Sequence, residues 1–87
     1  MTGDMNDVII SVLSAQARLR VPAADLGEHQ DLYTAGMTSH ASISVMLGLE
    51  DAFDVEFPDR MLTRQVFSSI ASIRAALSEL TEPALHG

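Results

Sequence analysis

The 87-residue sequence contains no cysteine, no tryptophan and no lysine. Without cysteine the chain can form no disulfide, offers no thiolate nucleophile and lacks thiolate ligands for a metal. The three histidines show no paired spacing with carboxylates, and the acidic residues of 50–56 lack the ligand alternation and central glycine of an EF-hand loop. We therefore predict no metal site.

Basic residues are scarce as well, because five arginines face twelve acidic residues and the formal net charge is -7. Nucleic acids and anionic membranes both attract basic surfaces, so neither kind of partner is expected. The acidic charge suits partner proteins with basic docking surfaces, but taken alone it is more simply explained by solubility. No apolar run is long enough to cross a bilayer, and the N-terminus lacks the positive region of a signal peptide, so we expect a cytoplasmic protein.

Apolar residues make up 47% of the chain, and their spacing of three and four predicts helices. We expect a single domain over residues 1–87, with an ordered core over 4–81 and frayed ends. The predicted fold is all-α, a four-helix bundle with three longer helices and one short third helix. The first three helices are predicted over 4–19, 39–53 and 59–62. A fourth helix is predicted to begin after a cap at Ser68 or Ser69 and to end at Glu82 and Pro83.

A long connection over residues 22–38 leads into the second predicted helix. Long ordered loops in small domains tend to be functional, and Leu26, Leu32 and Tyr33 should pin this one to the core. Ser39 follows the loop, at the expected start of the helix. Backbone N–H groups and the helix dipole favour a phosphate at that point. Serine is also an ordinary N-cap, worth about 1 kcal/mol, and this position alone favours the capping role.

The second predicted helix is apolar around much of its circumference, which is typical of a central helix. One exposed strip is predicted on it, and with two neighbours of Ser39 it forms a predicted docking surface for partner proteins: Thr38, His40, Ala41, Ser44, Gly48 and Asp51. Other roles are open for two of these residues. Thr38 is favoured as a helix cap, and Gly48 is favoured as a point of close internal packing.

Catalysis by the chain itself is not predicted. Ser39 and His40 could suggest a nucleophile and its base, but adjacent residues on a helix point about 100° apart and do not face each other. No nucleophile-elbow motif surrounds the serine. We therefore expect no catalytic residues and no enzyme activity.

The order of motifs along the chain resembles that of the acyl carrier proteins, a family of small acidic four-helix proteins. The resemblance lies in the loop 31–37, in Ser39 at the modification position, in the acidic segment 49–59 and in the start of the last helix at 68–73. It implies a phosphopantetheine arm attached covalently to Ser39 by a phosphopantetheinyl transferase. The terminal thiol of that arm would carry cargo as a thioester.

Two departures from the family pattern flank the serine. Thr38 and His40 stand where the family usually has aspartate and leucine, and the following turns lack the acidic residues of fatty-acid carriers. Standard fatty-acid partners are therefore not expected, and His40 could contact either the arm's phosphate or a partner. Residues 36–53 resemble the free-standing bacterial aminoacyl carrier proteins. This implies glycine or alanine as cargo, loaded by an ATP-dependent amino acid:carrier-protein ligase related to aminoacyl-tRNA synthetases.

Two alternatives stay open at this point. One is an acyl carrier for fatty-acyl or polyketide-type cargo, which would use the same Ser39 arm and an acyl-loading enzyme. The other belongs to a different class, a non-enzymatic helical module that binds a partner protein while Ser39 stays unmodified.

Overall fold

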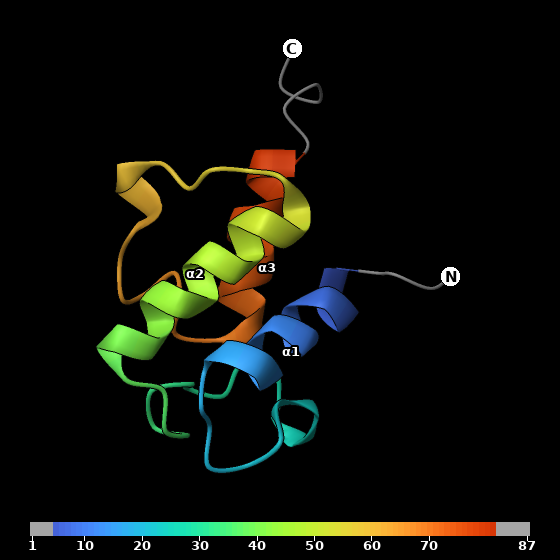
Figure 1. Cartoon of the computed structure of the whole chain (residues 1–87), viewed down its shortest axis with the longest axis vertical. Helices are drawn as coiled ribbons and strands as arrows, with labels where there is room; N and C mark the ends of the chain where they lie inside the picture. Colours follow the sequence, from blue (N-terminus) through green and yellow to red (C-terminus); the bar gives the residue numbers. More distant parts are fainter. Residues whose placement is uncertain (1–4, 82–87) are drawn as a thin grey trace.

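The computed structural model describes residues 5–81, which form three α-helices and two 3-10 helices and contain no strand (Figure 1). The α-helices are α1 (Met5–Gln16), α2 (Ser39–Phe53) and α3 (Ile70–Thr81), and the 3-10 helices are η1 (Ala23–Asp25) and η2 (Asp59–Met61). The predicted all-α class is confirmed. The predicted four-helix bundle is not confirmed, because the short third helix expected over 59–62 is only the single 3-10 turn η2, after which Leu62 leaves the helical region with a ψ of 62°.

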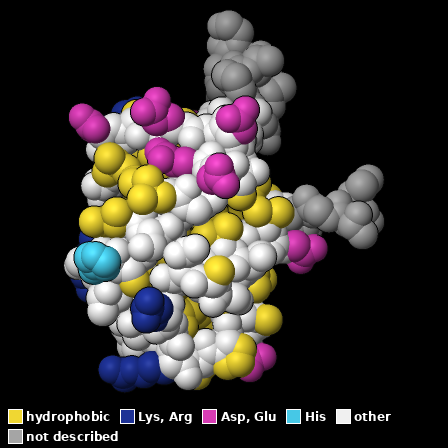
Figure 2. Space-filling model, viewed as in Figure 1, with side chains coloured by type: hydrophobic (Ala, Val, Ile, Leu, Met, Phe, Trp, Pro, Cys, Tyr) yellow, Lys and Arg dark blue, Asp and Glu magenta, His cyan; other side chains and the backbone are white. Residues whose placement is uncertain are grey.

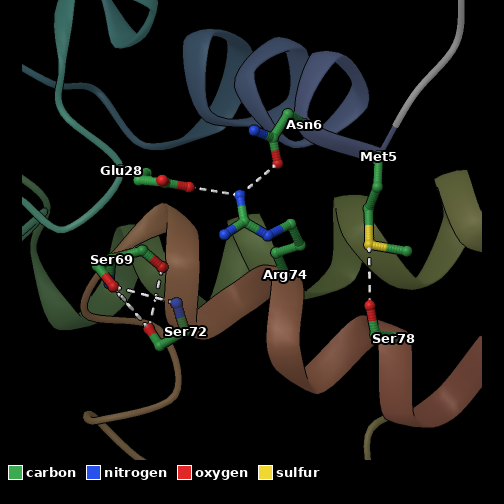
Figure 3. Close-up of polar contacts among 7 residues, drawn as sticks. All are labelled: Met5, Asn6, Glu28, Ser69, Ser72, Arg74 and Ser78. Atoms are coloured by element: carbon green, nitrogen blue, oxygen red, sulfur yellow. Dashed lines mark hydrogen bonds and ion pairs between the residues drawn. The ribbon is translucent and has the colours of Figure 1, made fainter. Parts of the chain in front are cut away.

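The helix bounds agree with the prediction for α2 and differ for α1. The predicted end at Leu19 was wrong, because Arg18 adopts a left-handed φ of 57° and closes the helix before it. At α3, the cap is Ser69, whose hydroxyl accepts a hydrogen bond from the Ser72 backbone N–H at 3.1 Å (Figure 3). The predicted start at residue 4, the predicted stop at 82–83 and the fraying of both ends lie outside the described residues.

All three α-helices contribute to one hydrophobic core, in which α1 packs against both α2 and α3 (Figure 1). The close approach of α1 and α2 depends on Gly48, since a Cβ at that position would lie 2.9 Å from Val12 Cγ1. The predicted packing role of Gly48 is thus confirmed. The largest fully buried side chains come from the helices and the first loop: Ile9, Leu13, Leu32, Val45, Leu49, Ile70, Ile73 and Leu77.

Arg74 of α3 ties the long loop between α1 and α2 to the helices. Its Nη1 donates to Asn6 Oδ1 of α1 at 2.9 Å and to Glu28 Oε1 of the loop at 2.5 Å (Figure 3). The Ala71 backbone N–H also donates to the Glu28 carbonyl at 2.8 Å. These contacts make the loop an ordered connection, as its apolar residues predicted.

The Arg74–Glu28 pair should make stability depend on pH. The hydrogen bond from Arg74, and then its charge, hold the pKa of Glu28 below the ordinary value of 4.5. A carboxylate whose pKa is lowered in the folded state stabilises the fold above its unfolded pKa, and this contribution is lost as the pH falls through the folded pKa. We expect Glu28→Gln to lose less stability on acidification than the wild type, measured by urea unfolding between about pH 6 and about pH 3.

The matched control is Glu56→Gln, which removes an exposed carboxylate that makes no ion pair within residues 5–81. If both substitutions flatten the acid dependence equally, the Arg74 contact is not the cause.

Candidate functional site

Ser39 is the first residue of α2 and is exposed. It does not cap the helix, because the Thr38 hydroxyl accepts the hydrogen bond from the Ala41 backbone N–H at 3.0 Å. The role of Thr38 as the cap is thereby confirmed. Within residues 5–81 the Ser39 hydroxyl makes no hydrogen bond, so it does not stabilise the start of the helix.

The turn before α2 brings Thr38 and Ser39 to the surface. Asp31 Oδ1 accepts a hydrogen bond from the Tyr33 backbone N–H at 3.0 Å, which is an Asx turn. Gly36 has a φ of 124°, a conformation that residues with a Cβ avoid. The chain then buries Met37 and leaves Ser39 exposed. The glycine of this loop is therefore needed for the placement of the serine.

An open pocket of about 470 Å³ adjoins Ser39. Its walls come from the loop before α2, from the first two turns of α2 and from the segment between η2 and α3. The described residues that line it include no carboxylate, although the chain is acidic. They are Tyr33, Ser39, Ser42, Ile43, Met46, Leu62, Thr63, Arg64 and Phe67.

Arg64 is the charged side chain in this lining. Its guanidinium carbon lies 3.9 Å from the centroid of the Tyr33 ring, which is a cation–π contact. Nearby, the buried Phe67 packs edge-on against Phe57, with ring centroids 5.3 Å apart. The Tyr33–Arg64 contact joins the two pocket walls that α2 does not supply, and the Phe57–Phe67 contact packs one of these walls against the core.

The predicted docking strip is only partly exposed. Ala41 is 4% exposed and packs in the core, so its assignment as a docking residue was wrong. Gly48 faces α1 and cannot contact a partner through that side. His40 and Asp51 are exposed as predicted, and Ser44 is half-buried.

A different face of α2 points to solvent. Ile43 and Leu47 belong to the apolar residues of this helix, and each is 55% exposed. They lie one turn apart on α2, and Ile43 shares the Ser39 pocket with Leu62, which is 44% exposed. We call Ile43, Leu47 and Leu62 the apolar patch. Figure 2 shows hydrophobic side chains on this face below a group of acidic side chains at the C-terminal end of α2.

The described residues hold no group of three or more potential metal ligands, and His86 lies outside them. Among the same residues, no helix has the length and apolar character needed to cross a membrane.

Sequence reasoning missed Arg64, Leu62 and the pocket as a whole. The lining residues come from three segments, around 33, 39–46 and 62–67, that no local motif connects. Helical spacing reports which residues share a helix face, but it does not report which loop will cover that face. No signal in the sequence could have joined Arg64 to Ser39.

Residues 9–79 match the family model described as the phosphopantetheine attachment site. The chain is 45% identical over 69 residues to the aminoacyl carrier protein of Agrobacterium fabrum, covering 79% of this chain and 83% of that relative.

Two solved structures are similar. One is a carrier protein from Agrobacterium tumefaciens in complex with an engineered Bradyrhizobium japonicum glycine:[carrier protein] ligase and ATP, with a TM-score of 0.85 and 41% identity over 87% of this chain and 99% of that one. The other comes from a complex of the Bradyrhizobium japonicum ligase with glycylated carrier protein, with a TM-score of 0.70 and 28% identity over 82% of this chain and 95% of that one.

Proposed function

The chain belongs to the family of carrier proteins that have a phosphopantetheine attachment site, and we propose that Ser39 bears this group and that a separate ligase loads it with a small amino acid of the glycine or alanine class. The placement of Ser39 carries this proposal. It is the exposed first residue of α2, and its hydroxyl is available for modification because Thr38 caps the helix. The chain itself catalyses nothing and serves as the carrier.

The residues around Ser39 fit the group. The N–H groups at the start of α2 favour the phosphate, and no carboxylate among the described pocket residues opposes it. Ile43, Met46 and Leu62 offer an apolar wall to the aliphatic part of the arm. When bound, the group would supply the thiol that this cysteine-free chain lacks, and an amino acid would be held there as a thioester.

We infer that the ligase docks on the apolar patch. Exposed apolar side chains surrounded by polar residues are typical of protein interfaces. The acidic C-terminal end of α2 would pair with a basic rim on the partner, which favours fast and oriented association. Thr38, His40, Ser44 and Asp51 remain in the proposed docking surface, whereas Ala41 and Gly48 do not.

The test has two stages. Incubation with coenzyme A and a promiscuous phosphopantetheinyl transferase should raise the intact mass by one phosphopantetheine. The modified protein is then offered to a glycine:[carrier protein] ligase with glycine and ATP, and separately to an acyl-loading synthetase with a fatty acid.

We expect a glycine adduct that hydroxylamine removes, as a thioester requires, and no fatty-acyl adduct. Loading with fatty acids but with no amino acid would establish the fatty-acyl alternative. Failure to gain the first mass would contradict the carrier assignment and favour the interaction module.

A further inference from the structure

Arg64 has no structural ion pair to explain its position. Two other arginines pair with carboxylates, Arg60 with Glu79 at 3.0 Å and Arg74 with Glu28. Arg64 has no carboxylate partner among the described residues, in a chain where acidic residues outnumber arginines twelve to five. It lies instead in the wall of the pocket that contains Ser39.

The contact with Tyr33 holds the guanidinium without using its hydrogen-bond donors. The guanidinium carbon lies over the Tyr33 ring, and a contact with the ring face leaves the N–H groups of the guanidinium available for hydrogen bonds. These N–H groups match the oxygens of a phosphate and bind them more strongly than neutral donors would. The exposed Arg64 is thus held by the ring and keeps the donors that an anion needs.

The backbone on both sides of the contact is fixed. The Tyr33 carbonyl accepts a hydrogen bond from the Gly36 N–H at 3.1 Å, in the turn that leads to Ser39. On the other side, the Thr63 hydroxyl accepts a hydrogen bond from the Val66 N–H at 3.2 Å and closes the turn that contains Arg64. A side chain held at both ends loses little conformational entropy when it binds a ligand.

We propose that Arg64, stacked on Tyr33, is a positioning residue that binds the phosphodiester on Ser39 and holds the arm in the adjoining pocket. This inference rests on the proposed attachment at Ser39. The anion would lie between the start of α2 and the guanidinium, and the arm would follow the apolar wall that includes Ile43 and Met46. Arg64 acts on the arm alone and takes part in no reaction.

The experiment compares modified wild-type protein with Arg64→Gln, Arg64→Lys and the control Arg60→Gln. Arg60 is an exposed arginine of the same region that does not line the Ser39 pocket. The readouts are the phosphorus-31 resonance of the phosphodiester and nuclear Overhauser contacts from the arm to Ile43 and Met46. Intact mass first establishes that each protein carries the group, and the amide spectrum of each unmodified variant establishes its fold.

In Arg64→Gln we expect the phosphorus resonance to move to the position that the same phosphodiester has in the urea-unfolded modified protein, and the contacts to weaken several-fold. Arg64→Lys should retain part of both, because it keeps the charge and loses the planar donors. Arg60→Gln should resemble the wild type. Raising the salt concentration about tenfold should move the wild-type resonance in the direction of Arg64→Gln, which tests the ion pair without any substitution.

The role of Arg64 would be overturned if Arg64→Gln left the resonance position and the contacts unchanged, or if salt left them unchanged in the wild type. The attachment at Ser39 would stand in either case. Absence of the mass gain in the wild type would instead overturn the attachment itself.

Discussion

Ser39→Ala abolishes the gain of one phosphopantetheine mass, whereas Ser42→Ala and Ser44→Ala modify as the wild type does; this is the result we expect from the geometry of α2. Ser39 presents an exposed hydroxyl at the helix start without a hydrogen bond inside the described chain. The Ser42 hydroxyl donates to the Ser39 carbonyl at 2.7 Å and is held along the helix. Ser44 is half-buried in the second turn.

The loss should be complete, because no other nucleophile can replace the missing oxygen at that position. The fold of Ser39→Ala should be unchanged, since Thr38 and not Ser39 supplies the cap. Circular dichroism and urea unfolding check the fold, and intact mass after incubation with coenzyme A and transferase checks attachment. A full mass gain in Ser39→Ala would place the attachment elsewhere and defeat the assignment.

The second large effect concerns stability. Leu49 lies in the third turn of α2 and is 0% exposed, in contact with the core that all three helices share. Leu49→Ala removes apolar contacts and leaves a cavity, which should lower the free energy of unfolding by about 2–5 kcal/mol. Small domains are stable by only about 5–15 kcal/mol, so the midpoint of urea unfolding should fall steeply.

Leu47→Ala is the matched control, because it changes the same residue type two positions away on the same helix. Leu47 is 55% exposed, so we expect a stability change within about 0.5 kcal/mol. Loading by the ligase should instead weaken, through a higher KM for the carrier, if the apolar patch is the docking site. Equal destabilisation by the two substitutions would show that the exposed face of α2 has been assigned incorrectly.

Some structural features followed directly from local sequence. The bounds of α2 were predicted correctly, because Gly36, Thr38 and the apolar spacing after them are all signals that act within one turn. A cap at Ser68 or Ser69 was predicted for the same reason, and the structure selects Ser69. Attachment at Ser39 stays a prediction that rests on family membership and on this placement.

The exposed face of α2 was predicted only in part, because that helix is apolar on more than one side. His40 and Asp51 are exposed as expected, but Ile43 and Leu47 are exposed as well. The spacing of the helix allowed several orientations, and the choice depended on α1, whose Val12 packs where Gly48 leaves space. The small Ala41 was then turned inward and the larger Ile43 and Leu47 outward. Residue size at the helix contact outweighed the simple count of apolar positions.

The sequence by itself determined the helical class, the acidic surface and a serine at a helix start, since each depends on composition or on neighbours within a few residues. Only the tertiary structure decided which face of α2 reaches solvent and which side chains surround Ser39. Tyr33, Ser39 and Arg64 are separated along the chain and meet in one pocket because the loop and the segment after η2 both pack against α2. Local spacing encodes a helix period, but the direction of the core is set by packing across the whole chain.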